Sequence, residues 1–533
     1  MQPPRLSFSL LTGRAVPRVV RRHFTTHTTL CSGIKPVLVR LLEDGSEVHI
    51  NKDEIFKYQR YRWITRRRDP QHLAARYRES NLDNLLEAAN LSTDYKGARY
   101  KIQASGRMVS KCVEGQNSKA FVLTMDNGEQ LVARLPNPNA GPAFFTTASE
   151  VATRNFVYRS NSGGAEYIME EKAKGYSLGS IWGRLSRSSQ FVIIDQVVEI
   201  ERKLASVSFP MQGCLYYTSD LKSEVPDVKG LDTMLSISPG LNIEDCRQLS
   251  CFGIGPSNDR KLWNVFRHST RLDRGPWTNL IHYVTALGSN ELNWARCHAK
   301  PRMNYYRSIE TPENPNEYLA LLQRYLDIAP HLVPNQPCSE YDNINTLSHP
   351  DLHLDNIFID RETHQITSII DWQLAAITPS FLQHPHPQML ELSLSPGSDE
   401  QRGREKELLE YYYKVTEKDP YLSTRVTPIN LISGCWERED TFSLRESLIK
   451  VAAYWDQLRQ DDTPCPVDFD VDELAEHERE RELIEGLSNI VQQLEEEGLI
   501  PIGGMVRPEE YEHAKMVTEG DQQRELHEKV WPY

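Results

Sequence analysis

The first 42 residues contain no acidic side chain. They carry seven basic residues and are rich in serine and threonine, and no apolar segment suited to a secretion signal is present. This composition is typical of a mitochondrial transit peptide. We therefore expect residues 1–33 to be a transit peptide and the protein to work in mitochondria, with the matrix as the favoured compartment. The alternative is a basic tail that has no targeting role.

The chain also lacks paired cysteines and long apolar runs. Its nine cysteines are scattered and include no C-x-x-C pair, so the sequence indicates neither a zinc ribbon nor a disulfide framework. No run of eighteen apolar residues is present, so we expect no transmembrane segment. Removing the seven basic residues of the first 42 from the net charge of −13 leaves −20 on the remaining 491 residues. Such an acidic body argues against nucleic acid as a partner.

The rest of the sequence shows strand patterns first and helix patterns afterwards. An N-terminal extension occupies residues 34–95, with helical spacing over 53–90. A small lobe over 96–173 follows, in which strands and the turn Asp126-Asn127-Gly128 predict an antiparallel sheet. The predicted strands cover residues 108–113, 120–124, 129–135 and 165–170, and a predicted helix covers residues 146–158.

Helices dominate beyond residue 173. A large lobe is expected over 174–420 and a helical C-terminal extension over 421–533. The extension contains an acidic helix whose apolar residues recur at helical spacing, so we expect one face of it to pack on the main body. Those apolar residues are Leu483, Ile484, Leu487, Ile490, Val491 and Leu494.

The stretch HPDLHLDN, from His349 to Asn356, is the strongest chemical signal. Two short strands, 357–360 and 366–370, form a predicted hairpin that returns Asp371 beside Asn356. Phosphoryl transfer needs a residue that takes the acceptor proton and oxygen ligands for Mg²⁺, and a carboxylate and an amide oxygen suit that ion. The alternative is an ordinary hairpin flanked by polar turn residues.

HPDLHLDNIF together with IIDWQ resembles the aminoglycoside phosphotransferase-like branch of the protein-kinase superfamily. Further stretches are similar to one fungal mitochondrial family, the altered inheritance of mitochondria protein nine family. The resemblance implies an α+β, two-lobed protein-kinase-like fold, with a small antiparallel-sheet N-lobe and a large, mainly helical C-lobe. It also implies ATP and Mg²⁺ as cofactors. The further stretches are VARLPNPNAGPAFFTTASEVAT, GAEYIMEEKAKGYSLGSIW, FPMQGCLYY and RLDRGPW.

The same resemblance assigns roles to individual residues. Asp351 corresponds to the catalytic base, and Asn356 and Asp371 correspond to the Mg²⁺ ligands. His349 corresponds to a histidine that supports the catalytic loop. His353 stands where kinases place a phosphate-contacting lysine, so we expect it either to meet phosphate or to face solvent. A zinc site built from His349, His353 and Asp355 is a weaker alternative, since the loop lacks the helical register of such sites.

The nucleotide-binding parts depart from the kinase pattern. The loop that should cover the phosphates has a single glycine, Gly115, and we expect backbone N–H groups near Ser118 to meet phosphate. Arg134 replaces the usual lysine of the third strand, and Glu150 is its expected partner; arginine and lysine are not interchangeable at such a site. The segment between Arg154 and Ala165 also has no room for a further strand, so either the sequence is shortened there or the sheet is reduced.

These features support a leading hypothesis and two alternatives. The leading one is an ATP- and Mg²⁺-dependent phosphotransferase acting on an unknown hydroxyl of a small molecule or protein. The first alternative is a non-catalytic pseudokinase or scaffold involved in mitochondrial maintenance, which the departures favour. The second is an assembly factor that works through the acidic C-terminal helices. The sequence carries no signal for the acceptor or the oligomeric state.

Overall fold

The computed structural model describes most of the chain between residues 37 and 516. The described residues are 37–42, 45–51, 54–57, 62–63, 69–77, 82, 85–86, 108–113, 115, 117–124, 128, 130–158, 168–222, 229–231, 249–264, 267–304, 307–308, 311–334, 344–392, 399–416, 422–458, 463–496, 505–508, 510–514 and 516. The predicted transit peptide, residues 1–33, lies outside them. No helix within these ranges is long and apolar enough to cross a membrane.

A six-stranded sheet forms the small lobe. Its strand order is β2-β1-β4-β5-β6-β7, and all neighbouring strands are antiparallel except β1 and β4. Helix α4 (Ala143–Tyr158) connects the last two strands along the chain. The strands are β1 (Val37–Leu41), β2 (Glu47–His49), β4 (Met108–Lys111), β5 (Ser118–Thr124), β6 (Gln130–Pro136) and β7 (Ile168–Glu171).

The last four of these strands are the ones expected from the sequence, but β1 and β2 come from the N-terminal extension. The extension therefore shares a sheet with the small lobe and enlarges it at the edge opposite β7. Residues 159–167, where the sequence leaves no room for a further strand, are outside the described part of the chain. No strand occurs between α4 and β7 among the residues that the structure describes.

The helix expected over residues 53–90 is wrong in its middle part. The structure has helices α1 (Glu54–Lys57) and α2 (Asp69–Arg76) with the strand β3 (Arg62–Trp63) between them. β3 pairs antiparallel with β15 (Met505–Val506), close to the other end of the chain. Backbone pairing with a distant segment thus overrides the local helical pattern.

The large lobe has two apolar cores. The first lies between α5 (Arg187–Ala205), α10 (Asp399–Thr416) and the hairpin of β12 (Ile357–Ile359) and β13 (Ile366–Ile369). α5 begins at Ser186, whose hydroxyl accepts a hydrogen bond from the backbone N–H of Ser189. This core therefore supports the hairpin that carries the candidate catalytic residues.

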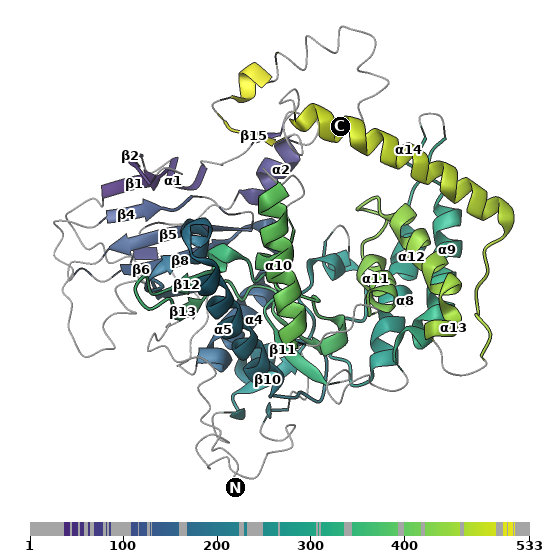
Figure 1. Cartoon of the computed structure of the whole chain (residues 1–533), viewed down its shortest axis with the longest axis horizontal. Helices are drawn as coiled ribbons and strands as arrows, with labels where there is room; N and C mark the ends of the chain where they lie inside the picture. Colours follow the sequence, from purple (N-terminus) through teal and green to yellow (C-terminus); the bar gives the residue numbers. More distant parts are fainter. Residues whose placement is uncertain are drawn as a thin grey trace.

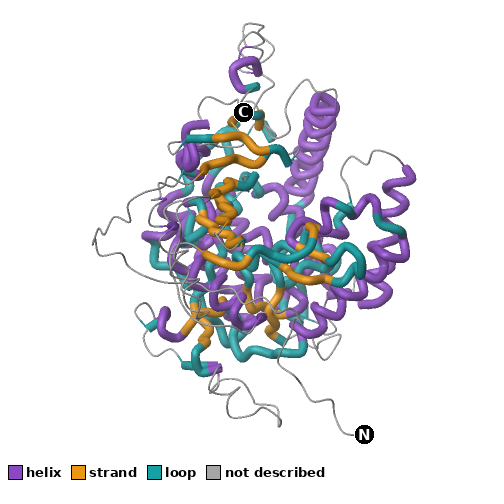
Figure 2. Tube along the Cα trace, turned by 90° about the vertical axis from the view of Figure 1, so that its left-hand side faces the viewer, coloured by secondary structure: helices purple, strands orange, loops and turns teal. Residues whose placement is uncertain are grey.

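The second core is purely helical. It is built by α8 (Leu280–His298), α9 (Pro315–Leu332), α11 (Leu422–Ile432) and α12 (Thr441–Ala453). The first part of the C-terminal extension predicted from the sequence thus completes a helical bundle of the large lobe. Figure 1 shows this bundle on the side of the molecule opposite the sheet, and Figure 2 shows the strands from the sheet side.

Shorter elements connect these layers. β8 (Tyr176–Ser177) adds to the hairpin beside β12, β9 (Cys214–Tyr217) pairs with β10 (Phe252–Gly255), and β11 (Asn345–Ser348) pairs with β14 (Ala376–Pro379). Two short helices, α6 (Thr218–Leu221) and α13 (Trp455–Leu458), complete the set of described α-helices together with α14 (Val471–Glu496).

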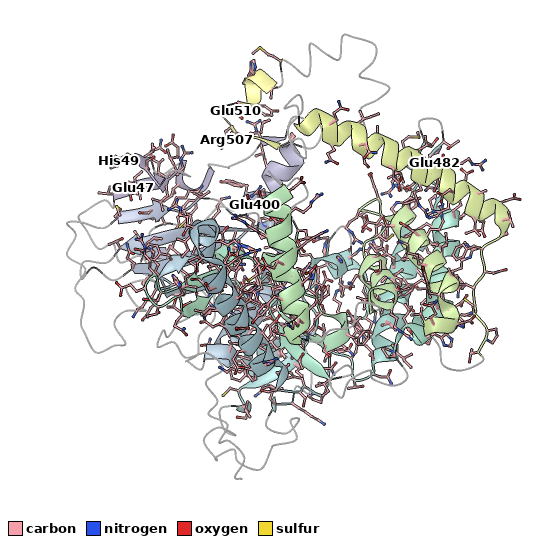
Figure 3. The ribbon with its side chains drawn as sticks, in the orientation of Figure 1. Glu47, His49, Glu400, Glu482, Arg507 and Glu510 are labelled. Carbon is pink, nitrogen blue, oxygen red and sulfur yellow. The ribbon has the colours of Figure 1, made fainter. Side chains whose placement is uncertain are left out.

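α14 leaves part of the apolar face predicted from its spacing exposed, although Ile484 and Leu487 are half-buried. Leu483 is 58% exposed and Ile490 is 52% exposed. The first half of the helix is held by ion pairs, since the Glu480 carboxylate binds both Arg307 and Arg445. The rest runs along the edge of the molecule toward α2, and Glu482 lies near the middle of the helix (Figures 1 and 3). The prediction that this face packs on the main body is therefore wrong for Leu483 and Ile490.

Candidate active site

The hairpin β12–β13 brings the predicted metal-binding residues to one end of the large-lobe sheet. The backbone N–H of Ile370 donates to the carbonyl oxygen of Asn356 at 2.9 Å, so Asp371 follows directly on a residue bonded to Asn356. The Asn356 side chain is buried, and its Nδ2 donates to the Asp351 carbonyl oxygen at 2.8 Å. Because the amide nitrogen is used in this way, the amide oxygen is directed away from the Asp351 backbone.

His349 supports this loop and is not available as a ligand. Its Nε2 lies 2.9 Å from the Ile370 carbonyl oxygen, and its Nδ1 accepts the backbone N–H of Asp351 at 3.2 Å. The ring also packs edge-on against the buried Trp372. Burial lowers the pKa of His349 to about 4, so the imidazole is neutral at pH 7 with its proton on Nε2. Both ring nitrogens are occupied, which argues against the zinc alternative.

Arg134 joins the two lobes at this site. Its Nη1 lies 2.7 Å from Glu150 Oε1 on α4, so the pair expected from the sequence is formed, and its Nη2 lies 2.8 Å from Asp371 Oδ1 on the hairpin. Arg134 and Glu150 are buried, whereas the Asp371 side chain is 34% exposed. Asp371 therefore has one carboxylate oxygen on Arg134, and the backbone of Gln373 also hydrogen-bonds to its carboxylate.

Arg134, Glu150 and Asp371 form a triad, and their charge states follow from burial and mutual attraction. Burial alone would lower the pKa of Arg134, but the nearby carboxylates of Glu150 and Asp371 raise it above its usual range. Burial alone would raise the pKa of Asp371, but Arg134 lowers it by attraction and hydrogen bonding. Burial raises the pKa of Glu150, which Arg134 opposes. The triad thus keeps a positive Arg134 and an ionised Asp371 at pH 7.

Asp351 has a different environment from Asp371. Burial raises its pKa, Asp371 and Glu391 add repulsion, and His353 and Arg260 oppose the shift. The His353 ring lies beside the carboxylate, with its Nε2 3.8 Å from Asp351 Oδ2. The His353 Nδ1 accepts the backbone N–H of Asp355 at 3.1 Å, so the ring caps the short 3-10 helix Leu354–Asn356.

The loop between β4 and β5 is anchored on several sides. Arg76 of α2 donates from Nη2 to the Gly115 carbonyl oxygen at 2.7 Å, and Lys119 Nζ donates to the Arg76 carbonyl oxygen at 2.8 Å. A Cβ at Gly115 would meet no atom closer than 3.6 Å, so this glycine is not required for space. Ser118, the other residue predicted here, begins β5 opposite Pro136. Hydrogen bonds of the Arg76 and Lys119 side chains therefore hold the loop, and its conformation does not depend on glycine.

Two residues beside the catalytic loop had no predicted role. The Ser177 hydroxyl donates to Asp355 Oδ1 at 2.8 Å. A Cβ at Gly179 would lie 2.1 Å from the same oxygen, so only glycine allows Asp355 to approach this closely. Both belong to the stretch KGYSLGS that contributed to the family resemblance, but the resemblance assigned them nothing.

The site offers two partly exposed carboxylates, Asp351 and Asp371, together with the buried amide of Asn356 and the buried cation of Arg134. Asn356 and Asp371 supply hard oxygen ligands of the kind that Mg²⁺ takes together with nucleotide phosphates. Among the residues that the structure describes, no group of three or more His, Cys, Asp or Glu side chains is placed to hold a metal ion.

Comparisons with known proteins agree with this geometry. A family model described as "Phosphotransferase enzyme family" matches residues 286–380, which include the loop His349–Asn356 and the β12–β13 hairpin. A subtelomeric hrmA-associated cluster protein of Aspergillus fumigatus is 31% identical, over 80% of this chain and 96% of that protein. The chain belongs to the same family. This family lies within the aminoglycoside phosphotransferase-like group of the kinase-like fold, as the sequence resemblance indicated.

More distant members carry another name. The altered inheritance of mitochondria protein 9, mitochondrial, of Saccharomyces cerevisiae is 23% identical over 69% of each chain. Among solved structures, a putative aminoglycoside phosphotransferase of Ralstonia eutropha is 13% identical, with 70% of this chain and 99% of that chain covered and a TM-score of 0.34. At that TM-score the likeness establishes no equivalence between individual residues.

Proposed function

We propose that the protein is an ATP- and Mg²⁺-dependent phosphotransferase that acts on a hydroxyl acceptor in mitochondria. The observation that carries the proposal is the Arg134 guanidinium, which binds Glu150 in one lobe and Asp371 in the other. A scaffold that binds no nucleotide does not need an ion pair between a buried cation and a partly exposed carboxylate. A site that holds phosphate and a metal between its lobes does need this arrangement.

Asp351 would receive the acceptor proton. Its carboxylate is only half-buried, so an acceptor hydroxyl can reach it. Its raised pKa makes it a stronger base than an ordinary aspartate. The backbone bonds from His349 and Asn356 fix the loop that carries it, and they would orient the carboxylate toward the acceptor.

Asn356 and Asp371 would hold the Mg²⁺ ion. The fit rests on two observations: the Asn356 nitrogen is already used by the Asp351 carbonyl, and Arg134 occupies only one oxygen of Asp371. When bound, Mg²⁺ neutralises charge on the phosphates. Arg134 would add its own charge from the small lobe, and Glu150 would keep Arg134 in place.

The non-catalytic alternative has its own support. The loop from Gly115 to Lys119 is tied to α2 by Arg76, an unusual restraint for a loop that covers phosphates. The arginine in place of lysine points the same way. This protein would then bind nucleotide or a partner without transferring phosphate.

Mitochondrial location and the nature of the acceptor belong to the same proposal. The first 42 residues have the composition of a transit peptide, and the yeast relative carries the word "mitochondrial" in its name. We favour the matrix. The acceptor is a hydroxyl on a small molecule or a protein, and no described feature selects between them.

Phosphate transfer from labelled ATP is the test. Purified protein is incubated with Mg²⁺, γ-labelled ATP and either small-molecule or protein fractions of mitochondria, with Asp351→Asn as the matched variant. We expect label in an acceptor fraction with the wild-type protein and at least a 100-fold lower rate with the variant. Nucleotide binding by both proteins without transfer by either one would favour the non-catalytic alternative.

A further inference from the structure

Arg260 connects the large lobe to the phosphate-side loop of the small lobe. It begins the short 3-10 helix Arg260–Leu262, which lies between β10 and α8. Its Nη1 donates to Asn117 Oδ1 at 2.8 Å, and Asn117 lies in the loop between β4 and β5. No motif in the sequence marked Arg260, since it lies far from both Asn117 and the HPDLHLDN stretch along the chain.

The position of Arg260 is fixed by its surroundings. Asp259 caps the 3-10 helix by accepting the Lys261 N–H at 3.0 Å. Leu262 is buried in the helical core, and the ring of Trp263 packs on Phe145 of α4 at a centroid distance of 5.1 Å. Arginine has five N–H donors, and the bond to Asn117 uses one of them.

The stem of Arg260 packs on a glycine of the small lobe. Gly141 has a φ of +125°, and a Cβ there would lie 3.4 Å from Arg260 Cγ and 2.6 Å from Thr146 Oγ1. Gly141 follows directly on the 3-10 helix Pro138–Ala140, and Asn137 before that helix donates its N–H to the Asn117 carbonyl oxygen at 2.9 Å. The arginine thus lies against Gly141 and against Asn117 of the β4–β5 loop, the loop expected from the sequence to cover the phosphates.

The positive charge of Arg260 acts on the carboxylate of Asp351, the candidate base. Arg260 and His353 both oppose the upward pKa shift of Asp351. Arginine is charged at all physiological pH values, whereas histidine is not. The one permanent positive charge among these two neighbours of Asp351 is therefore supplied by the large-lobe 3-10 helix.

We infer that Arg260 binds the terminal phosphates of the nucleotide from the large-lobe side and stabilises the transferred phosphoryl group. The inference rests on the proposed function. In the transfer, the acceptor oxygen forms a bond to the γ-phosphorus, and the bond from that phosphorus to the bridging oxygen breaks. The bridging oxygen leaves with the electron pair as part of ADP, and the hydroxyl proton passes to Asp351. Arg260 would bind the non-bridging oxygens, opposite Arg134.

This role is tested by measuring the affinities of the full chain for ATP and for AMP. Isothermal titration with Mg²⁺ present gives both values. With Arg260→Met we expect ATP binding to weaken about 10- to 100-fold while AMP binding stays within about twofold, because AMP lacks the terminal phosphates. Lys261→Met is the control, since Lys261 donates to the Asn430 carbonyl oxygen on the large lobe, and we expect it to change neither affinity.

Two further variants keep the test decisive if Arg260→Met folds poorly. Arg260→Lys keeps the charge and the stem but loses the fork of donors, so we expect a smaller loss confined to ATP. Asn117→Ala removes the tether and keeps the cation, with the same expected selectivity. Equal weakening of ATP and AMP, or no weakening in any Arg260 variant, would overturn the inference. A wild-type protein that binds neither nucleotide would defeat the proposed function itself.

Discussion

Arg134 Nη2 donates to Asp371 Oδ1 at 2.8 Å, and this bond ties strand β6 of the small lobe to the catalytic hairpin of the large lobe. Asp371 has a φ of +63°, a left-handed conformation that is uncommon for any residue other than glycine. The ion pair to Arg134 and the adjacent Ile370–Asn356 backbone bond hold it there. The relative position of the two lobes is thus coupled to whether the Asp371 carboxylate is bound to Arg134.

Arg134→Met should destabilise the protein strongly. The substitution leaves Glu150, whose side chain is fully buried, without its partner, and breaking a buried ion pair from one side costs about 3–5 kcal/mol. Chemical denaturation measures the change in the free energy of unfolding. The double variant Arg134→Met/Glu150→Gln should recover much of that loss because no charge is then buried alone. A double variant as unstable as the single one would contradict the ion-pair explanation.

Gly179→Ala should disturb the catalytic loop while Gly183→Ala should not. A Cβ at Gly179 would lie 2.1 Å from Asp355 Oδ1, whereas a Cβ at Gly183 would meet no atom within 4 Å. Asp355 lies next to Asn356 in sequence, so its displacement should weaken Mg-ATP binding by about tenfold or more, roughly the loss of one charged hydrogen bond. Isothermal titration compares the two variants. Equal nucleotide affinity in both would refute the steric argument.

The stability of the protein should depend on His349 between pH 6.5 and 4. The folded pKa of His349 is lowered to about 4 by burial, from an ordinary value of 6.5. In that range the unfolded chain binds a proton that the folded protein does not, so the contribution of His349 to stability is complete above pH 6.5. It is lost as the pH falls to 4, with a total on the order of 3 kcal/mol.

His349→Gln removes the titrating group and provides the measurement. The difference in unfolding free energy between wild type and variant should shrink as the pH falls from 6.5 to 4. His268→Gln, at an exposed histidine, is the control and should leave the pH dependence of the wild type unchanged. A wild-type minus His349→Gln difference that stays constant over this range would show that His349 is not held neutral by the fold.

Local patterns predicted the parts of the fold that local forces decide. The strands of β4, β5, β6 and β7 and the catalytic hairpin follow from alternation and turn residues, which act between neighbours in sequence. The pairing of Arg134 with Glu150 followed from the family resemblance. These predictions needed only short-range information or a motif.

Other parts depend on partners that are distant in sequence. β3 is a strand because β15 pairs with it, and no residue near Arg62 indicates that pairing. The spacing of Leu483 and Ile490 predicts an apolar face on α14, but periodicity cannot tell whether anything covers it. Arg260 reaches Asn117 only through the folded arrangement of the two lobes, so no spacing rule could have assigned it to the site.

Binding of ATP with and without Mg²⁺, compared between wild type and Asp371→Asn, tests the central claim most directly. Asp371→Asn keeps the size of the side chain, removes the charge that pairs with Arg134 and weakens the metal-binding oxygen; Glu362→Gln, on the exposed turn of the same hairpin, is the control. The account predicts that Mg²⁺ tightens ATP binding to the wild type and to Glu362→Gln, and that Asp371→Asn loses this Mg²⁺ effect. ATP binding that is indifferent to Mg²⁺ in the wild type, or equally Mg²⁺-dependent in Asp371→Asn, would contradict it.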